Sequence, residues 1–268
     1  MQEKTPRRWL ITGASSGIGA ALAEAALARG DSVIACARNA EALARFEAKA
    51  PGRATGLQLD VSQLDRIEPA IRQVIAGGPL DIVVNNAGRG HFGTAEETSI
   101  AEARTVFEVN LFAPWAVAHA VLPHFRERRS GTLINISSGA GLAAVTGMSA
   151  YSASKFALEG LSEVLATETA ALGIKVLIVE PGSIATPFIS SSTPVAARRI
   201  ADYDPISVDG KAMIEAHYAT ITVTAEDVAT AIMDALDSPN PPLRLLVGDD
   251  HRDAAREKGR QLIRISET

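Results

Sequence analysis

Short apolar segments alternate with longer segments of helical length along the whole chain, and this alternation strongly constrains the fold. Seven segments rich in Val, Ile and Leu have the length of buried strands: 9–11, 32–36, 56–59, 82–84, 132–136, 175–179 and 243–247. Six segments between them have the length and composition of helices: 18–29, 40–49, 64–76, 99–127, 151–172 and 225–236. Right-handed crossovers place each helix against the sheet that it leaves. We therefore expect a doubly wound α/β fold, with a parallel sheet of about seven strands and helices on both faces.

The chain is long enough for one large hydrophobic core, and no linker divides it. It has 268 residues, of which 47% are hydrophobic, and no Gly/Ser/Pro-rich stretch separates two cores. We expect a single domain over 1–268. The segment from about 187 to 223 is long and irregular, and such segments in compact domains are usually functional or disordered. We interpret it as a partly helical lid.

The charge of the chain argues against two classes of partner. The formal net charge is −5, whereas nucleic acids and anionic membranes bind basic surfaces. The single cysteine, Cys36, lies in an apolar segment and is expected to pack in the core. Residues 1–8 are polar, and the apolar run 9–11 is too short for a signal-peptide core or a membrane span. We expect a cytoplasmic protein with no nucleic-acid or membrane partner.

Tyr151 and Lys155 are spaced so that a cation can act on a phenol. Residues four apart share one face of a helix, and both lie in the predicted helix 151–172. A phenol has a pKa of about 10, and a cation within about 4–6 Å lowers the pKa of an acid by roughly 1–3 units. The pair therefore predicts that Tyr151 is an acid/base near neutral pH. The alternative is a surface tyrosine beside a solvated lysine, and only the neighbouring motifs decide between the two.

A glycine-rich segment, 12–19, connects the first strand to the first helix. It reads Thr-Gly-Ala-Ser-Ser-Gly-Ile-Gly, so its glycine spacing differs from Gly-x-Gly-x-x-Gly. Glycine allows a tight turn and close approach of a ligand to the backbone, and a helix N-terminus offers N–H groups to phosphate. The segment predicts a pyrophosphate site.

These motifs belong to a longer series, which resembles the single-domain branch of the short-chain dehydrogenase/reductase family over residues 8 to about 190. The other members of the series are Asp60-Val61, Asn85-Asn86-Ala87-Gly88, Asn110, Ser138 and Pro181-Gly182. Segments 151–160 and 179–182 are similar to hydroxysteroid- and retinol-dehydrogenase-like members. The resemblance implies a Rossmann-type fold, a nicotinamide cofactor, and hydride transfer between an alcohol and a ketone or aldehyde.

The resemblance also implies roles for three side chains near the end of the predicted fifth strand. Ser138 would hold the substrate oxygen while Tyr151 transfers a proton to it. Lys155 would lower the pKa of the tyrosine and donate hydrogen bonds to the nicotinamide ribose. Ser137 is an equal candidate from its position alone, and only the family spacing selects Ser138.

Asn110 completes the implied catalytic set. It lies in an apolar run, so a buried side-chain amide there needs partners. Pro114 has no N–H to donate to the carbonyl of Asn110 four residues back. We hypothesise that this carbonyl binds a water molecule that links Lys155 to solvent, as the resemblance implies. The alternative is a core asparagine with satisfied hydrogen bonds.

The preference for one nicotinamide cofactor depends on charge at the end of the second strand. A carboxylate there would accept the ribose 2′-hydroxyl of NAD and repel the 2′-phosphate of NADP. The chain has no carboxylate over 35–39 but has Arg38, a charge-assisted donor. NADP(H) is therefore favoured over NAD(H). Ser16 stands where many NADP-preferring relatives have a second basic residue.

The remaining cofactor contacts follow from the resemblance. Asp60 would face the adenine, although Asp at a strand end also suits a helix N-cap. Thr186 would hold the nicotinamide carboxamide, with a simple loop residue as the alternative. The expected cofactor-binding residues are Gly13, Ser15, Ser16, Gly17, Ile18, Gly19, Arg38, Asp60, Val61, Asn86, Ala87, Gly88, Tyr151, Lys155, Pro181, Gly182, Ile184 and Thr186.

The leading interpretation is an NADP(H)-dependent oxidoreductase for a lipophilic alcohol or ketone, assembled as a homodimer or homotetramer like its relatives. The alternatives are an NAD-dependent dehydrogenase, a cofactor-binding sensor without turnover, and an epimerase or dehydratase. Three histidines lack metal-ligand spacing, so no metal site is predicted: His91, His119 and His124. Candidate pocket walls, mostly apolar, are His91, Phe92, 139–148, Phe188, Ile189, Ile200, Tyr203, Met213, His217 and Tyr218.

Overall fold

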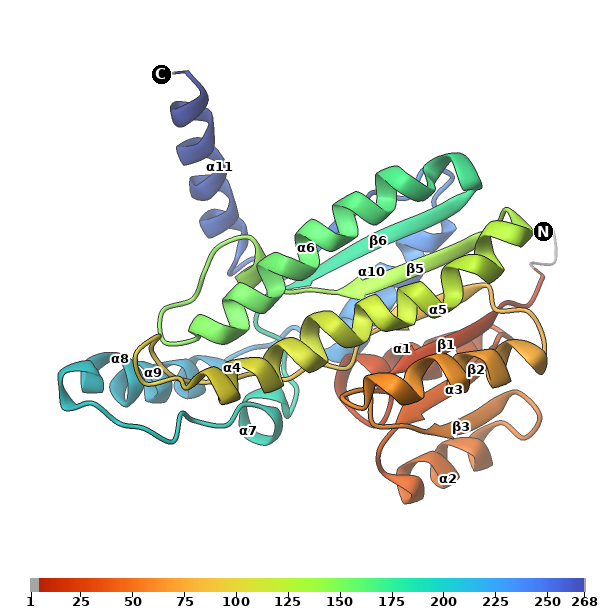
Figure 1. The fold of residues 1–268 in the computed structure, drawn as a ribbon, viewed down its shortest axis with the longest axis horizontal. Helices are drawn as coiled ribbons and strands as arrows, with labels where there is room; N and C mark the ends of the chain where they lie inside the picture. The colour runs from red at the N-terminus through yellow and green to blue at the C-terminus, as the bar shows by residue number, and fades with distance from the viewer. Residues whose placement is uncertain (1–4, 268) are drawn as a thin grey trace.

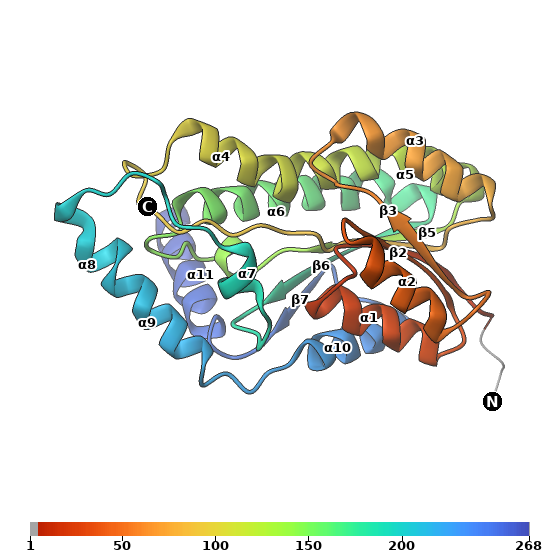
Figure 2. The same cartoon turned by 90° about the horizontal axis from the view of Figure 1, so that it is seen from below.

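The computed structural model describes residues 5–267, in which one seven-stranded sheet lies between two layers of helices (Figures 1 and 2). The strands are β1 (Arg8–Thr12), β2 (Ser32–Ala37), β3 (Ala54–Gln58), β4 (Ile82–Asn85), β5 (Gly131–Ile136), β6 (Ile174–Pro181) and β7 (Arg244–Val247). Their order is β3-β2-β1-β4-β5-β6-β7, and all neighbours are parallel. The predicted Rossmann-type doubly wound fold is confirmed. The order reverses between β1 and β4, which opens a crevice at the carboxyl ends of these strands.

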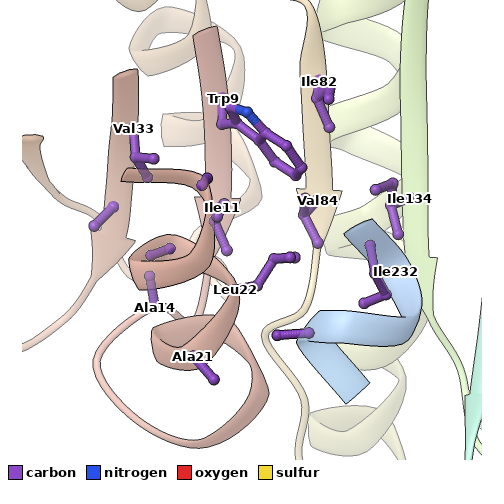
Figure 3. Close-up of a cluster of buried hydrophobic side chains, with 14 of the residues drawn as sticks. Trp9, Ile11, Ala14, Ala21, Leu22, Val33, Ile82, Val84, Ile134 and Ile232 are labelled. Atoms are coloured by element: carbon purple, nitrogen blue, oxygen red, sulfur yellow. The ribbon is translucent and has the colours of Figure 1, made fainter. Parts of the chain in front are cut away.

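Helices cover both faces of the sheet. One layer contains α1 (Gly17–Ala28), α2 (Ala40–Lys49) and α10 (Ala225–Asp237). The other contains α3 (Leu64–Ala76), α4 (Ile100–Phe107), α5 (Ala113–Arg128) and α6 (Ser149–Thr169). Side chains alternate along a strand, so Trp9 and Ile11 of β1 pack under the first layer while Leu10 packs under the second. Figure 3 shows the first cluster, where Leu22 and Ile232 face β1 and β4. Both faces of the central strands are therefore buried.

The predicted helix 99–127 is interrupted. A π-helical turn, Glu108–Phe112, separates α4 from α5. Pro114 lacks an N–H and cannot continue the regular hydrogen-bond ladder, which is a local cause for this irregular turn. The continuous helical stretch 100–128 is the one helix in the described range whose length and mean hydropathy, 1.3, would suit a membrane span. Its buried residues, including Val121 and Phe125, pack in the second core cluster.

The segment predicted as a lid contains short helices and is tied to the loop after β4. Its helices are α7 (Phe188–Ser192), α8 (Asp204–Ser207) and α9 (Asp209–Tyr218). Buried Glu97 accepts hydrogen bonds from the backbone N–H of Ile200 at 3.1 Å and from the Ser207 hydroxyl at 3.2 Å. Phe92 and Val195 form an isolated parallel bridge. Residues 1–4 and 268 of the predicted domain lie outside the described residues.

One helix was missed in the sequence. Helix α11 (Arg252–Ser266) follows β7, has no buried residue, and extends away from the sheet (Figure 1). The strand–helix alternation ends with β7, and the first turns of α11 are dominated by charged side chains. The first turns of α11 therefore lack the buried apolar pattern by which the other helices are recognised in the sequence.

Candidate active site

A cavity of about 610 Å³ lies at the carboxyl ends of the strands, within the size range of ligand pockets. Of the cofactor residues predicted from the sequence, only Gly19 and Tyr151 do not line it. Those that do are Gly13, Ser15, Ser16, Gly17, Ile18, Arg38, Asp60, Val61, Asn86, Ala87, Gly88, Lys155, Pro181, Gly182, Ile184 and Thr186. Ser138 also lines the cavity. The fold thus brings motifs from the whole sequence around one space.

The turn between β1 and α1 requires glycine at different positions for different structural reasons. Gly17 lines the cavity and has a φ of +55°, a left-handed conformation that favours glycine. Gly13 and Gly19 make room for another loop, because a Cβ at either would lie within 2.9 Å of the side-chain nitrogen of Asn86. Gly19 does not line the cavity, and its contact with a cofactor stays a prediction. Ser16 is the N-cap of α1 but makes no side-chain capping hydrogen bond, so it leaves N–H groups of the first turn available to an anion.

The ends of β2 and β3 place opposite charges at one end of the cavity. Arg38 is exposed and lines the cavity, as does Asp60. Asp60 accepts hydrogen bonds from the N–H and the hydroxyl of Ser62, at 3.0 and 2.8 Å. Burial alone would raise the pKa of Asp60, but these hydrogen bonds and the charge of Arg38 outweigh it and lower that pKa. Asp60 is not the N-cap of α3, a position that Gln63 occupies.

Asn110 lies in the π-helical turn and is fully buried. Its side-chain amide donates to the carbonyl of Arg89 at 2.8 Å and to the hydroxyl of Ser154 at 2.9 Å. Its side-chain carbonyl accepts from the N–H of Arg89 at 2.8 Å. Asn110 therefore fixes the loop after β4 against α6, and the expected partners of its amide are present. The relay through its main-chain carbonyl stays a prediction.

Lys155 projects from α6 into the interior at the end of β5. Its ammonium donates a hydrogen bond of 2.8 Å to the carbonyl of Ile136, and the residue is only 4% exposed. Burial lowers the pKa of Lys155 to about 8, while the charge of Glu159 acts in the opposite direction. Lys155 therefore lies at the cavity with a pKa close to neutral pH, so nearby charges decide how much of it is protonated.

Tyr151 is more deeply buried than the sequence suggested. The ammonium of Lys155 lies 5.8 Å from the centroid of its ring. Burial raises the pKa of Tyr151 above its usual value, with Ser138 acting in the opposite direction and Tyr218 adding to the rise. The expectation of a lowered tyrosine pKa is thus wrong for this structure, because burial dominates. Ser138, rather than Ser137, is the serine that interacts with the phenol.

The segment 187–223 packs over Tyr151. The ring of Phe188, in α7, lies with its centroid 5.7 Å from that of the tyrosine, and Phe188 also lines the cavity. Tyr151 belongs to a small apolar cluster beneath the lid, which also contains Phe92, Ala140, Met148, Val145, Phe188 and Ile214. The wall around the phenol is therefore apolar.

Comparison with known proteins identifies the family. The family model described as short chain dehydrogenase matches residues 7–195. This range contains all motifs from which the resemblance was inferred.

The chain belongs to the short-chain dehydrogenase family.

Curated relatives match over most of their length. The chain is 35% identical to "Oxidoreductase BOA17" of Botryotinia fuckeliana over 244 residues, which cover 90% of this chain and 89% of that protein. It is 36% identical to "Retinol dehydrogenase 8" of Bos taurus over 253 residues, or 89% of this chain and 80% of the relative. Members of this family are oxidoreductases, and the chain shares that class.

Solved structures of the family share the whole fold. A short-chain dehydrogenase from Streptomyces avermitilis has a TM-score of 0.89 at 41% identity, covering 98% of this chain and 95% of its own. A family member from Burkholderia phymatum in complex with NAD has a TM-score of 0.84 at 25% identity, covering 99% and 97%. A metagenomic short-chain oxidoreductase in complex with NADP has a TM-score of 0.73 at 29% identity, covering 92% and 98%.

The nicotinamide cofactors of short-chain dehydrogenases fit the residues of this cavity. The uncapped start of α1 suits a pyrophosphate, and Thr186, in the loop after β6, lines the cavity beside Gly17, where a Cβ would lie 3.6 Å from its methyl group. Within residues 5–267, no three His, Cys, Asp or Glu side chains are grouped in a way that would hold a metal ion.

Two residues at this short-chain dehydrogenase site were missed in the sequence. Asp250 accepts a hydrogen bond of 2.8 Å from the N–H of Ser183, and a Cβ at Gly182 would lie 2.0 Å from its carboxylate. His251 packs on Gly139, where a Cβ would lie 2.3 Å from its ring. The available signal was their place directly after β7, at the same edge of the sheet as the other motifs.

Proposed function

We propose that this protein is an NADP(H)-dependent oxidoreductase that interconverts a lipophilic alcohol and the corresponding ketone or aldehyde. The observation that carries the proposal is the grouping of Ser138, Tyr151 and Lys155 at the end of β5, beside a cavity lined by the predicted dinucleotide residues. A sensor without turnover would not need an acid/base group in this place.

The side chains divide the chemistry between them. The bound nicotinamide supplies or accepts the hydride. Tyr151 donates its phenolic proton to the substrate oxygen during reduction, and the raised pKa of Tyr151 keeps that proton in place beforehand. Ser138 orients the oxygen, and the ammonium of Lys155 stabilises the phenolate that remains. In the direction of oxidation the same groups act in reverse.

Charge at the end of β2 supports NADP(H). Arg38 is exposed at the cavity, and no carboxylate lies between Ala35 and Asn39. A guanidinium forms strong, charge-assisted hydrogen bonds with a phosphate. Relatives with known structures bind either NAD or NADP, so the choice rests on this side chain.

The apolar cluster around Tyr151 supports a lipophilic substrate. Six apolar residues, from the loop after β4, the segment before α6 and the segment 187–223, form one packed cluster with Tyr151, and the ring of Phe188 contacts that of the tyrosine. One relative, by its name, acts on retinol, an apolar alcohol. A sugar or a charged acid would leave its polar groups unpaired against this wall.

We also propose a cytoplasmic homodimer or homotetramer in which the segment 187–223 is the substrate lid. Helices α5 and α6 have large apolar side chains that are substantially exposed, namely Trp115 at 53%, Phe156 at 40% and Val164 at 51%. Gly160 on α6 has no atom within 4 Å of the position of a Cβ, which leaves space for a second helix. Light scattering with a Val164→Lys variant tests this: a monomer in the variant supports the proposal, and a monomeric wild type contradicts it.

Loss of NADPH absorbance at 340 nm across a panel of carbonyl compounds tests the activity. Turnover in the wild type that is absent in Tyr151→Phe supports the proposal, whereas NADPH binding without any turnover supports the sensor. Isomerisation or loss of water without net use of NADPH would indicate an epimerase or dehydratase.

The same assay tests the cofactor. An Arg38→Asp variant should lose roughly 10- to 100-fold in kcat/KM for NADPH, the value of one charge-assisted hydrogen bond, and lose much less for NADH. Equal losses with both cofactors would contradict the assignment.

A further inference from the structure

A buried charge cluster lies beside the proposed active site and links two elements that carry it. The guanidinium of Arg244, in β7, donates from Nη1 to carboxylate oxygens of both Glu159 and Glu180. It also donates from Nη2 to Glu163 at 2.5 Å. The side chains of Glu159 and Glu180 are 7% and 2% exposed, whereas that of Glu163 is 57% exposed. Two of the three carboxylates are therefore removed from solvent.

The buried members of the cluster are attached to the two elements that hold the site. Glu159 lies one helical turn after Lys155 on α6, so the two side chains share a face of the helix. Glu180 precedes Pro181, the last residue of β6, after which the loop that lines the cavity begins. Arg244 therefore joins the helix of Lys155 to the strand that leads into this loop.

One oxygen of Glu159 is not used by Arg244. Its Oε1 is buried and has no hydrogen-bond partner in the described range, and the same holds for the hydroxyl of Ser137. Both atoms lie against Gly141, because a Cβ there would be 3.2 Å from Oε1 and 2.9 Å from the Ser137 hydroxyl. A buried carboxylate oxygen without a partner is costly. Because burying this carboxylate is costly, a functional role for the charge of Glu159 explains its presence better than packing does.

We propose that Glu159, held in place by Arg244, is a positioning residue whose negative charge keeps Lys155 protonated at neutral pH. The inference rests on the proposed function, because only that function requires the side chain of Lys155 to be charged. The resemblance to the family implies that this ammonium binds the nicotinamide ribose and stabilises the tyrosine oxygen.

The surroundings of Lys155 supply few other charges. On α6 it faces Tyr151 and Glu159, and β5 contributes the neutral carbonyl of Ile136. The loop after β4 contributes Gly88, whose Cβ position is 3.9 Å from Nζ, and the neutral amide of Asn110 lies at the same place. The other charged groups of the cluster are Glu180 in β6 and Arg244 in β7, and Arg244 donates to both Glu159 and Glu180.

The charge of Glu159 opposes the effect of burial. Burial lowers the pKa of Lys155 to about 8, and Glu159 is the charged group that raises it. Without that charge, the pKa of Lys155 would fall further. A larger fraction of Lys155 would then be neutral between pH 7 and pH 8.

The test compares Glu159→Gln with Glu163→Gln. Both variants remove one carboxylate from Arg244, but only Glu159 is buried and faces Lys155. The first readout is the affinity for NADPH between pH 6 and pH 9, measured by the fluorescence of the bound nicotinamide. The second is the pH profile of kcat/KM with a substrate from the carbonyl panel.

Glu159→Gln should bind NADPH at least about twofold more weakly than the wild type at pH 8, the effect of a half-unit fall in the pKa of Lys155 from about 8, and equally well at pH 6. Its alkaline limb in kcat/KM should move to lower pH by about half a unit or more, the effect of losing one nearby charge. Glu159→Asp, which keeps the charge, should restore most of the wild-type profile. Glu163→Gln should match the wild type in both readouts.

Identical pH profiles of affinity in Glu159→Gln, Glu163→Gln and the wild type would overturn the inference. Glu159→Met is the second variant if the glutamine variant does not fold, because it keeps the length of the side chain and leaves Arg244 its bonds to Glu180 and Glu163. It predicts the same shifts. If no substrate is turned over, the proposed function fails, while the affinity profile still decides the role of Glu159.

Discussion

Replacing Glu180 by Gln should remove a pH-dependent cost to stability. Glu180 is 2% exposed at the end of β6. Burial, followed by the charge of Glu159, raises the pKa of Glu180 from 4.5 to about 7, although Arg244 acts in the opposite direction. The folded protein therefore holds a proton at this carboxyl over a pH range in which the unfolded chain has released it.

The sign and size of the effect follow from this difference. Below pH 4.5, folded and unfolded chains are both protonated at Glu180, so its burial carries no ionisation cost. Between pH 4.5 and pH 7 the unfolded chain loses the proton first, and the free energy of unfolding falls as the pH rises. The full loss is about 3 kcal/mol, at 1.36 kcal/mol per pKa unit, and most of it falls between pH 5 and pH 8. Gln cannot ionise and carries no such loss.

Urea unfolding at pH 5 and pH 8, without added cofactor, measures the effect. The free energy of unfolding of Glu180→Gln relative to the wild type should rise by roughly 2–3 kcal/mol between the two pH values, which corresponds to roughly 5–10 °C in Tm for a chain of this size. Glu163→Gln is the matched control, because this exposed glutamate contacts the same Arg244. Its difference from the wild type should not change with pH. A Glu180→Gln difference that is equal at both pH values would refute the reasoning.

Three further predictions concern packing and reactivity. Gly19→Ala should lower the free energy of unfolding by about 1–3 kcal/mol in urea, because its Cβ would lie 2.3 Å from the side chain of Asn86. Gly259→Ala in α11, with open space at its Cβ, should be neutral or stabilising, and equal losses in the two variants would contradict this. Asn110→Ala should lower the free energy of unfolding in urea by about 2–4 kcal/mol, since it removes three buried hydrogen bonds. A loss below about 1 kcal/mol would show that the loop after β4 is held by other contacts. Cys36 should react with a thiol reagent only on unfolding, because it is buried and burial raises the pKa of its thiol to about 12; rapid labelling of the native protein at pH 8 would be the contrary result.

Local patterns in the sequence were sufficient for the sheet. Each of the seven predicted strands overlaps a strand of the structure, because buried parallel strands need continuous apolar runs and these are visible residue by residue. The predicted helix 99–127 shows what such patterns do not predict, because a π-helical turn interrupts it. Its apolar pattern continues through the π-helical turn, and only the hydrogen bonds show where the ladder changes.

The sequence predicted which residues form the candidate site but not how deeply each is buried. Ser138, Tyr151 and Lys155 were selected by spacing, and the fold places them at one end of β5. The spacing predicted a lowered pKa for Tyr151, whereas burial raises it. Spacing along a helix states which side chains are neighbours, but it contains no information on how much solvent remains around them.

The sequence by itself determined the order of strands and helices, the parallel sheet, and the motifs that meet at its carboxyl edge. These properties depend on side-chain periodicity and on short segments in which neighbours in space are neighbours in the chain. Only the tertiary structure decided that Gly19 packs on Asn86, that Phe188 covers Tyr151, and that Arg244 holds Glu159 and Glu180. Such contacts join residues that are distant in sequence, and the burial they create sets the charge states on which the proposed chemistry depends.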